Sequence, residues 1–197
     1  MFTIERCLYH YEDLCEEAKE RAREWYSGTL PDDFQFHAES EVDFLVLAGS
    51  LLGISFMKKE AVYSADSWNY GRCFFVVQGM YNYQKGWRGE IRKEFGGEIL
   101  EELEKIGMRL QNAQKRAFYA ITGCLYVTNF RSYGQGCELD DTTEEIREEI
   151  TQGIRDFCDF CTSRMVALLE YVESEEYITD QIIANEYTFN EDGEMEN

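Results

Sequence analysis

The sequence contains one proline, two histidines and few basic residues, and each shortage narrows what the protein can do. Pro31 stands alone, and no Ser/Gly/Pro-rich stretch is present, so the sequence indicates no interdomain linker. Lys and Arg number 19 against 39 Asp and Glu, which gives a formal net charge of -20. A field of that sign repels nucleic acid and anionic lipid, so we expect no direct nucleic-acid binding.

Recognised catalytic motifs are also missing. The sequence has no Walker A loop, no GxGxxG fingerprint and no GxSxG elbow. His10 and His37 have no second ligand at the spacing of a zinc site, so we expect structural or surface roles for both. Cys158 and Cys161 form a CxxC in the middle of a predicted helix, and we interpret them as core thiols, with a partial metal site or a redox pair as alternatives. We therefore predict no catalytic residue, no metal site and no cofactor.

No apolar run is long enough to cross a bilayer. The opening MFTIERCLYHY is too short and too polar for a secretory signal. The seven cysteines are an odd number and are most simply reduced thiols. These features predict a cytoplasmic protein without membrane contact, and a hydrophobic content of 44% is enough for a packed core.

Hydrophobic periodicity predicts helices alternating with β-rich stretches. Helices are expected over residues 13–28, 31–52, 88–119 with a break at Gly96-Gly97, 142–172, and in a short segment after Ser174. Strands are expected over residues 2–10 and in ISFMKK, AVYSAD, GRCFFVVQGMYNY, AITGCLYVTNF and SYGQGCELD, with EYTFN as an edge strand or ordered tail. The predicted fold class is α+β, an antiparallel sheet with several helices packed on it and a long acidic amphipathic helix near the C-terminus. We expect one domain over residues 1–189 and a flexible acidic tail over residues 190–197.

The acidic residues are concentrated towards the two ends of the chain. From residue 138 onward there are 19 Asp and Glu against 3 Lys and Arg, whereas residues 57–136 are slightly basic. The last segment nevertheless has the pattern of a folded one, with Ser174 as a helix cap and apolar residues on one face. We therefore predict that residues 174–189 fold onto the domain and display their carboxylates outward.

Two sets of residues are candidates for a partner-binding surface. The first is an acidic face on the C-terminal helices, and it comprises Glu144, Glu145, Glu148, Glu149, Glu173, Glu175, Glu176 and Asp180. The second is a polar and aromatic loop at a sheet edge, a composition found in recognition surfaces, and it comprises Trp68, Asn69, Tyr70 and Arg72. A tight loop anchored by one buried aromatic is the alternative for this second set.

Two segments near the ends of the chain have distinctive motifs, YHYEDLCEEAKERAREWY and YVESEEYITDQIIANEYTFNEDG. They resemble the opening and the ending of a family of small acidic proteins from bacteriophages and prophages, whose opening has a tyrosine, an FDELS-like step and EAKEKAREWY. VYSADSWNYGRCFFVVQGMYNY and LQNAQKRAFYAITGCLYVTNFRSYGQGCELD match middle segments more weakly, and SADSWNYGRC replaces most of the family's SGFWSQGDGA loop. Some members carry an antitoxin-like label. The resemblance implies a phage accessory protein that acts in the cytoplasm of a bacterial host cell.

Charge and resemblance together favour a protein that acts without catalysis. The expected function is inhibition of a basic, nucleic-acid-binding host defence protein, such as a CRISPR effector or a restriction enzyme, with nucleic-acid mimicry as the means. An antitoxin-like protein that neutralises a cognate toxin is one alternative. An enzyme with an unrecognised site is another, and its pocket would involve Trp68, Tyr70, Arg72, Tyr133 and His10.

Overall fold

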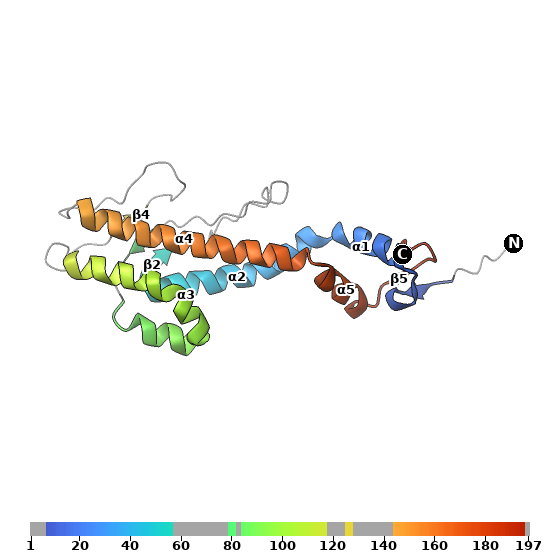
Figure 1. Cartoon of the computed structure of the whole chain (residues 1–197), viewed down its shortest axis with the longest axis horizontal. Coiled ribbons are helices and arrows are strands. Elements are labelled where there is room, and N and C mark those ends of the chain that lie inside the picture. The colour runs from blue at the N-terminus through green and yellow to red at the C-terminus, as the bar shows by residue number, and fades with distance from the viewer. Residues whose placement is uncertain (1–6, 57–78, 82–83, 118–124, 128–143, 196–197) are drawn as a thin grey trace. The chain divides into compact units, whose positions relative to one another are not determined.

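The computed structural model describes residues 7–56, 79–81, 84–117, 125–127 and 144–195 (Figure 1). The chain divides into two compact units. The terminal unit consists of Met1–Glu39 and Ala167–Asn197, and the central unit consists of Ser40–Val166. Both ends of the chain therefore fold together.

The terminal unit is built from short helices and one small strand pair. Strand β1 runs antiparallel to β5, with Tyr9 opposite Phe189 and His10 opposite Thr188. Figure 1 shows α1 (blue) and α5 (red-brown) near this strand pair. Its complete elements are β1 (Tyr9–His10), a 3-10 helix η1 (Tyr11–Asp13), α1 (Glu16–Ser27), α5 (Glu175–Ala184) and β5 (Thr188–Phe189), and α2 (Leu30–Leu52) begins in it.

Small residues on α1 allow the last segment of the chain to pack closely on it. Ala18 and Ala22 have no exposed surface, and neither does Phe189 of β5. The ring of Trp25 meets the Phe189 ring edge-on, with 5.8 Å between centroids. The apolar face predicted for the C-terminal segment is confirmed for Tyr177, Ile178 and Ile182, and Phe189 beyond it is also buried, while Ile183 of α5 stays 40% exposed.

The last described residues form a turn that requires glycine. Asn190 Oδ1 accepts hydrogen bonds from the backbone N–H groups of Asp192 and Glu194, each at 3.0 Å. Gly193 has φ +84° and lies so close to α1 that a Cβ there would be 2.1 Å from the carbonyl oxygen of Ala18. The segment expected as a tail is therefore ordered through Met195, which bridges back to Phe189.

The central unit consists mainly of helices that pack on helices. The ideal Cβ position at Gly153 of α4 lies 2.7 Å from the Leu110 side chain of α3, so these two helices meet at the glycine. Arg164 of α4 donates to Glu41 of α2 at 2.7 Å, and these hydrogen bonds raise the pKa of the guanidinium. The elements of the central unit are α2 from Ser40 onward, β2 (Ile54–Phe56), β3 (Gly79–Tyr81), α3 (Trp87–Ala117), β4 (Leu125–Val127) and α4 (Glu144–Val172) as far as Val166.

Helix α3 contains the break that the sequence predicts. Gly96 has φ 88° and ψ −174°, which interrupts the helical backbone between two helical segments. Across this break the ring of Trp87 lies against Gly107, where a Cβ would be only 2.4 Å from the indole. Arg88 and Glu104 form an ion pair at 3.0 Å between the same two segments. The two halves of α3 therefore fold back on each other.

The prediction of an α+β fold is wrong, because the described chain is mostly helical. Strands β2, β3 and β4 form an antiparallel sheet in that order, and the described part of each has three residues. The apolar faces of α3 and α4 pack on each other, as at Gly153, rather than covering a broad sheet. A helix with a wide apolar face can pack on another helix or on a sheet. Hydrophobic periodicity alone therefore did not distinguish a helical fold from an α+β fold.

The helix predictions are otherwise confirmed, including Ser174 as the cap of α5, whose hydroxyl accepts from the N–H of Tyr177. The buried stripe of α4 includes Ile150, Ile154, Phe157 and Met165. Strands expected in AVYSAD and SYGQGCELD, and the loop around Trp68, lie outside the described residues. Among the described helices, none combines the length and the apolar character that a membrane span requires.

Candidate interaction surface

The terminal unit carries most of the protein's negative charge. Its two segments contain 20 Asp and Glu against 4 Lys and Arg, whereas the central unit contains 19 against 15. Formal charges of -16 and -4 follow for two units that together make up the chain. The sequence showed that acidity gathers at both ends of the chain, and the fold brings these ends into one unit.

The eight predicted carboxylates of the acidic face do not belong to one unit. Glu173, Glu175, Glu176 and Asp180 lie on or beside α5 in the terminal unit, and all four are exposed. Glu144, Glu145, Glu148 and Glu149 lie in the first turns of α4 in the central unit, where Glu145 and Glu148 are exposed and Glu149 is half-buried. The side chain of Glu144 is outside the described part of the structure.

Cations of the terminal unit are engaged by its own carboxylates. Lys19 pairs with Glu16 at 3.2 Å and Arg21 with Asp192 at 3.5 Å. Arg23 pairs with Glu175 at 3.4 Å, so this predicted partner-binding carboxylate already has an internal cation. Arg6, the fourth basic residue, lies outside the described residues. The remaining exposed carboxylates far outnumber these pairs and leave the surface strongly acidic.

A partly buried polar network connects α1, α2 and α5 of this unit. The phenol of Tyr26 donates to Asp33 Oδ2 at 2.6 Å, and the phenol of Tyr177 donates to the same oxygen at 3.4 Å. His37 Nε2 lies 3.0 Å from the Tyr177 oxygen. The Tyr177 oxygen therefore contacts both Asp33 and His37.

The electrostatics of this network favour protonated phenols. Burial, followed by the charge of Asp33 and its hydrogen bond, raises the pKa of Tyr177 to about 12. Burial and the hydrogen bond to Asp33 also raise the pKa of Tyr26 well above its ordinary value. Proton transfer in catalysis is most effective when a pKa lies near the working pH, and these two phenols are far from it. The network therefore serves as a structural link.

Sequence reasoning did not identify this network as a unit. Asp33 and His37 are four residues apart on α2, so they lie on one helix face, which is a signal that the sequence contains. Tyr26 and Tyr177 join them only through tertiary structure. His37 contacts Tyr177 in this network, and the structural or surface role expected for it stays a prediction.

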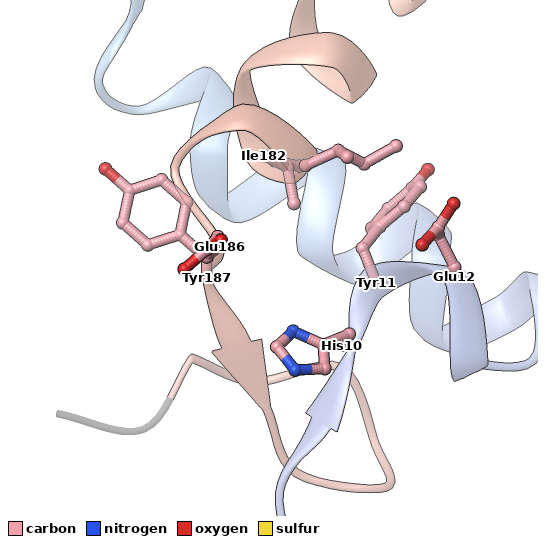
Figure 2. Close-up of a pocket in the computed structure, with 7 residues that line it drawn as sticks. His10, Tyr11, Glu12, Ile182, Glu186 and Tyr187 are labelled. Atoms are coloured by element: carbon pink, nitrogen blue, oxygen red, sulfur yellow. The ribbon is translucent and has the colours of Figure 1, made fainter.

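The terminal unit also has a cavity of about 430 Å³ between residues 10–12 and the end of α5. Figure 2 shows His10, Tyr11 and Glu12 on one side of it and Ile182 and Glu186 on the other. The ring of Tyr187 is directed away from His10 and meets Trp25 instead, with 5.2 Å between ring centroids. Of the five residues proposed for an enzyme pocket, His10 alone is among those the structure describes.

The CxxC cysteines are buried thiols that form no disulfide, which confirms their interpretation as core thiols. Burial, with a smaller contribution from Cys158, raises the pKa of the Cys161 thiol well above its usual value. The reactive thiolate is thus disfavoured. Within the described ranges, no group of three His, Cys, Asp or Glu side chains could hold a metal ion.

No protein-family model matches the chain, and neither a curated protein nor a solved structure is significantly similar to it. The resemblance to a phage family therefore stays a prediction.

Proposed function

We propose that this protein acts without catalysis, by binding a basic, nucleic-acid-binding protein through its acidic terminal unit. The observation that carries the proposal is the concentration of charge, with 20 acidic residues against 4 basic ones in the terminal unit. A surface of one sign raises the association rate with partners of the opposite sign and repels competing polyanions. A groove that normally holds nucleic acid has the complementary charge.

Order in the terminal unit supports a binding role. Its exposed carboxylates project from helices whose opposite faces are buried at Ala18, Ala22, Ile178 and Ile182. Carboxylates on such a backbone lose less conformational freedom on binding than those of a disordered acidic tail. A fixed array of negative groups can occupy positions that a partner provides for phosphates.

The biological setting comes from the family resemblance of the two chain ends. The resemblance supports a setting in a bacterial host cell during phage infection, in which the target would be a host defence protein such as a CRISPR effector or a restriction enzyme. Both types of target hold nucleic acid in positively charged channels or grooves. An inhibitor of this kind needs neither a cofactor nor a metal.

The proposal is tested by affinity purification of the full chain from phage-infected cells after nuclease treatment, with mass spectrometry of the bound proteins. We expect a basic nucleic-acid-binding protein at about 0.1 M salt and its loss at about 1 M salt, because screening shortens the range of the interaction. Adding the purified protein to that partner should release its nucleic acid. Recovery of no basic protein at low salt would contradict the proposal.

A matched pair of variants distinguishes the acidic terminal unit from net charge in general. The terminal variant carries Glu17→Gln, Glu24→Gln, Glu176→Gln and Asp180→Asn, and the central variant carries Glu90→Gln, Glu94→Gln, Glu98→Gln and Glu101→Gln. All eight carboxylates are exposed, and both variants lose four charges. We expect about tenfold weaker binding for the terminal variant and less than about twofold for the central one. Equal losses would contradict the assignment to the terminal unit.

A further inference from the structure

The cavity beside α5 has an unusual combination of lining groups. Glu12 and Glu186, both exposed, lie on opposite sides of it, as Figure 2 shows. Its exposed aliphatic surface comes from Ile183, which is 40% exposed, while Ile182 beside it is fully buried. The lining set contains no Lys or Arg.

The acidic groups of the cavity favour a cationic ligand. His10, Glu12 and Glu186 all line it, and among the described residues no group of three His, Cys, Asp or Glu side chains could hold a metal ion. A ligand that pairs with both carboxylates needs N–H donors directed to two sides of the cavity. A volume of about 430 Å³ is ample for one long side chain.

We propose that this cavity receives an arginine side chain of the basic partner, an inference that rests on the proposed function. A guanidinium group presents five N–H donors in a planar fork and can reach carboxylates on two sides, whereas an ammonium group acts as a point charge. The methylene stem of arginine would lie along Ile183. Tyr11 and His10 complete the wall on the side of β1 and η1.

The backbone at Glu186 is held by hydrogen bonds at the end of α5. Glu186 has φ 53°, a left-handed conformation that ends α5. Its N–H donates to the carbonyl of Ile183 at 3.0 Å, and the N–H of Tyr187 donates to that of Ile182 at 3.3 Å. The Glu186 side chain thus projects from a backbone that is hydrogen-bonded to the last turn of α5.

The test uses the full-length protein and peptides observed by NMR. The probes are a capped Gly-Ser-Arg-Ser-Gly peptide, its citrulline and lysine analogues, and free L-arginine. We expect the arginine peptide to shift the amide signals of residues 10–12 and 182–187. The citrulline peptide, which has nearly the same shape but no charge, should bind about tenfold more weakly. The lysine peptide should lie between them. If free L-arginine binds as tightly as the peptide, the proposal that the occupant is a protein side chain is overturned.

Variants separate the cavity from the general field of the terminal unit. Glu12→Gln with Glu186→Gln removes the two cavity carboxylates, and Glu17→Gln with Glu24→Gln removes two exposed carboxylates of α1 outside it. We expect roughly three- to tenfold weaker binding of the arginine peptide for the first pair and less than about twofold for the second. Retained dispersion of the amide spectrum shows that each variant is folded.

A deca-arginine peptide distinguishes failure of this inference from failure of the proposed function. If deca-arginine binds and both variant pairs weaken it equally, the cavity assignment is overturned and the acidic terminal unit remains the binding surface. If deca-arginine does not bind at low ionic strength, the proposed function is contradicted together with the cavity.

Discussion

At the scale of single residues, Asp33 is the centre of the terminal unit. One carboxylate oxygen accepts from the phenols of both Tyr26 and Tyr177, and Tyr177 also contacts His37. These four side chains come from three helices, so the network ties together segments that are distant in sequence. Removing the hydroxyl group of such a phenol leaves its former hydrogen-bond partners unsatisfied, which lowers stability.

Replacing Tyr177 with phenylalanine tests this network. Tyr177→Phe should lower the free energy of unfolding by about 1–2 kcal/mol at neutral pH, because Asp33 and His37 each lose a hydrogen-bond partner. Urea denaturation followed by circular dichroism measures the change. Tyr171→Phe is the matched control, since Tyr171 is 56% exposed and should tolerate the same change with little effect. A loss as large for Tyr171→Phe would contradict the role of the network.

The same residue predicts how stability changes at alkaline pH. The pKa of Tyr177 is raised to about 12 in the folded protein, above the ordinary value of 10.0. The folded state therefore holds this proton more tightly than the unfolded state does. The stabilisation is complete below pH 10 and is lost as the pH rises towards 12. Tyr177→Phe should make the unfolding free energy less dependent on pH in this interval, and an unchanged dependence would contradict the assignment.

At the scale of elements, Glu186 at the end of α5 has a strained backbone and also carries a carboxylate that we propose binds an arginine side chain. Glu186 adopts φ 53° at the position where helices commonly end with glycine. Glu186→Gly should stabilise the protein by a few tenths to about 1 kcal/mol, since glycine adopts this conformation without a Cβ clash but loses more backbone entropy. Thermal unfolding measures the change. Glu186→Gln keeps the strain and removes the charge, so an equal gain there would assign the effect to electrostatics.

The helices were predictable because their signals are local. The apolar stripes of α1 and α4, the cap at Ser174 and the glycine break at Gly96 each depend on residues within a few turns. The fold class was not predictable in the same way. Gly153 of α4 packs against Leu110 of α3, and nothing local indicates whether such a face meets a helix or a sheet.

The candidate site shows the same division between local and tertiary information. The exposure of Glu173, Glu176 and Asp180 was predicted from the helical pattern and is observed. The pairing of Tyr9 with Phe189, which joins the two chain ends, links residues that no local pattern connects. The cavity depends on that pairing, since its walls come from both ends, and sequence reasoning therefore missed it.

At the scale of the whole molecule, charge is divided unequally between two units. The terminal unit has 20 acidic residues against 4 basic ones and the central unit 19 against 15, so repulsion among like charges falls mainly on the first. Such repulsion destabilises a compact state, and a basic partner would relieve it on binding. The charge that favours association thus also lowers the stability of the unbound terminal unit.

This division predicts that salt stabilises the two units differently. Raising the ionic strength from about 0.01 M to about 0.15 M shortens the Debye length from about 30 Å to about 8 Å and screens the repulsion. Native-state hydrogen exchange should then show slower opening of α1 and α5, with little change in α3. Sucrose provides the control, because it favours compact states in both units without screening charge. Equal protection of α1, α5 and α3 by salt would show that self-repulsion is not concentrated in the terminal unit.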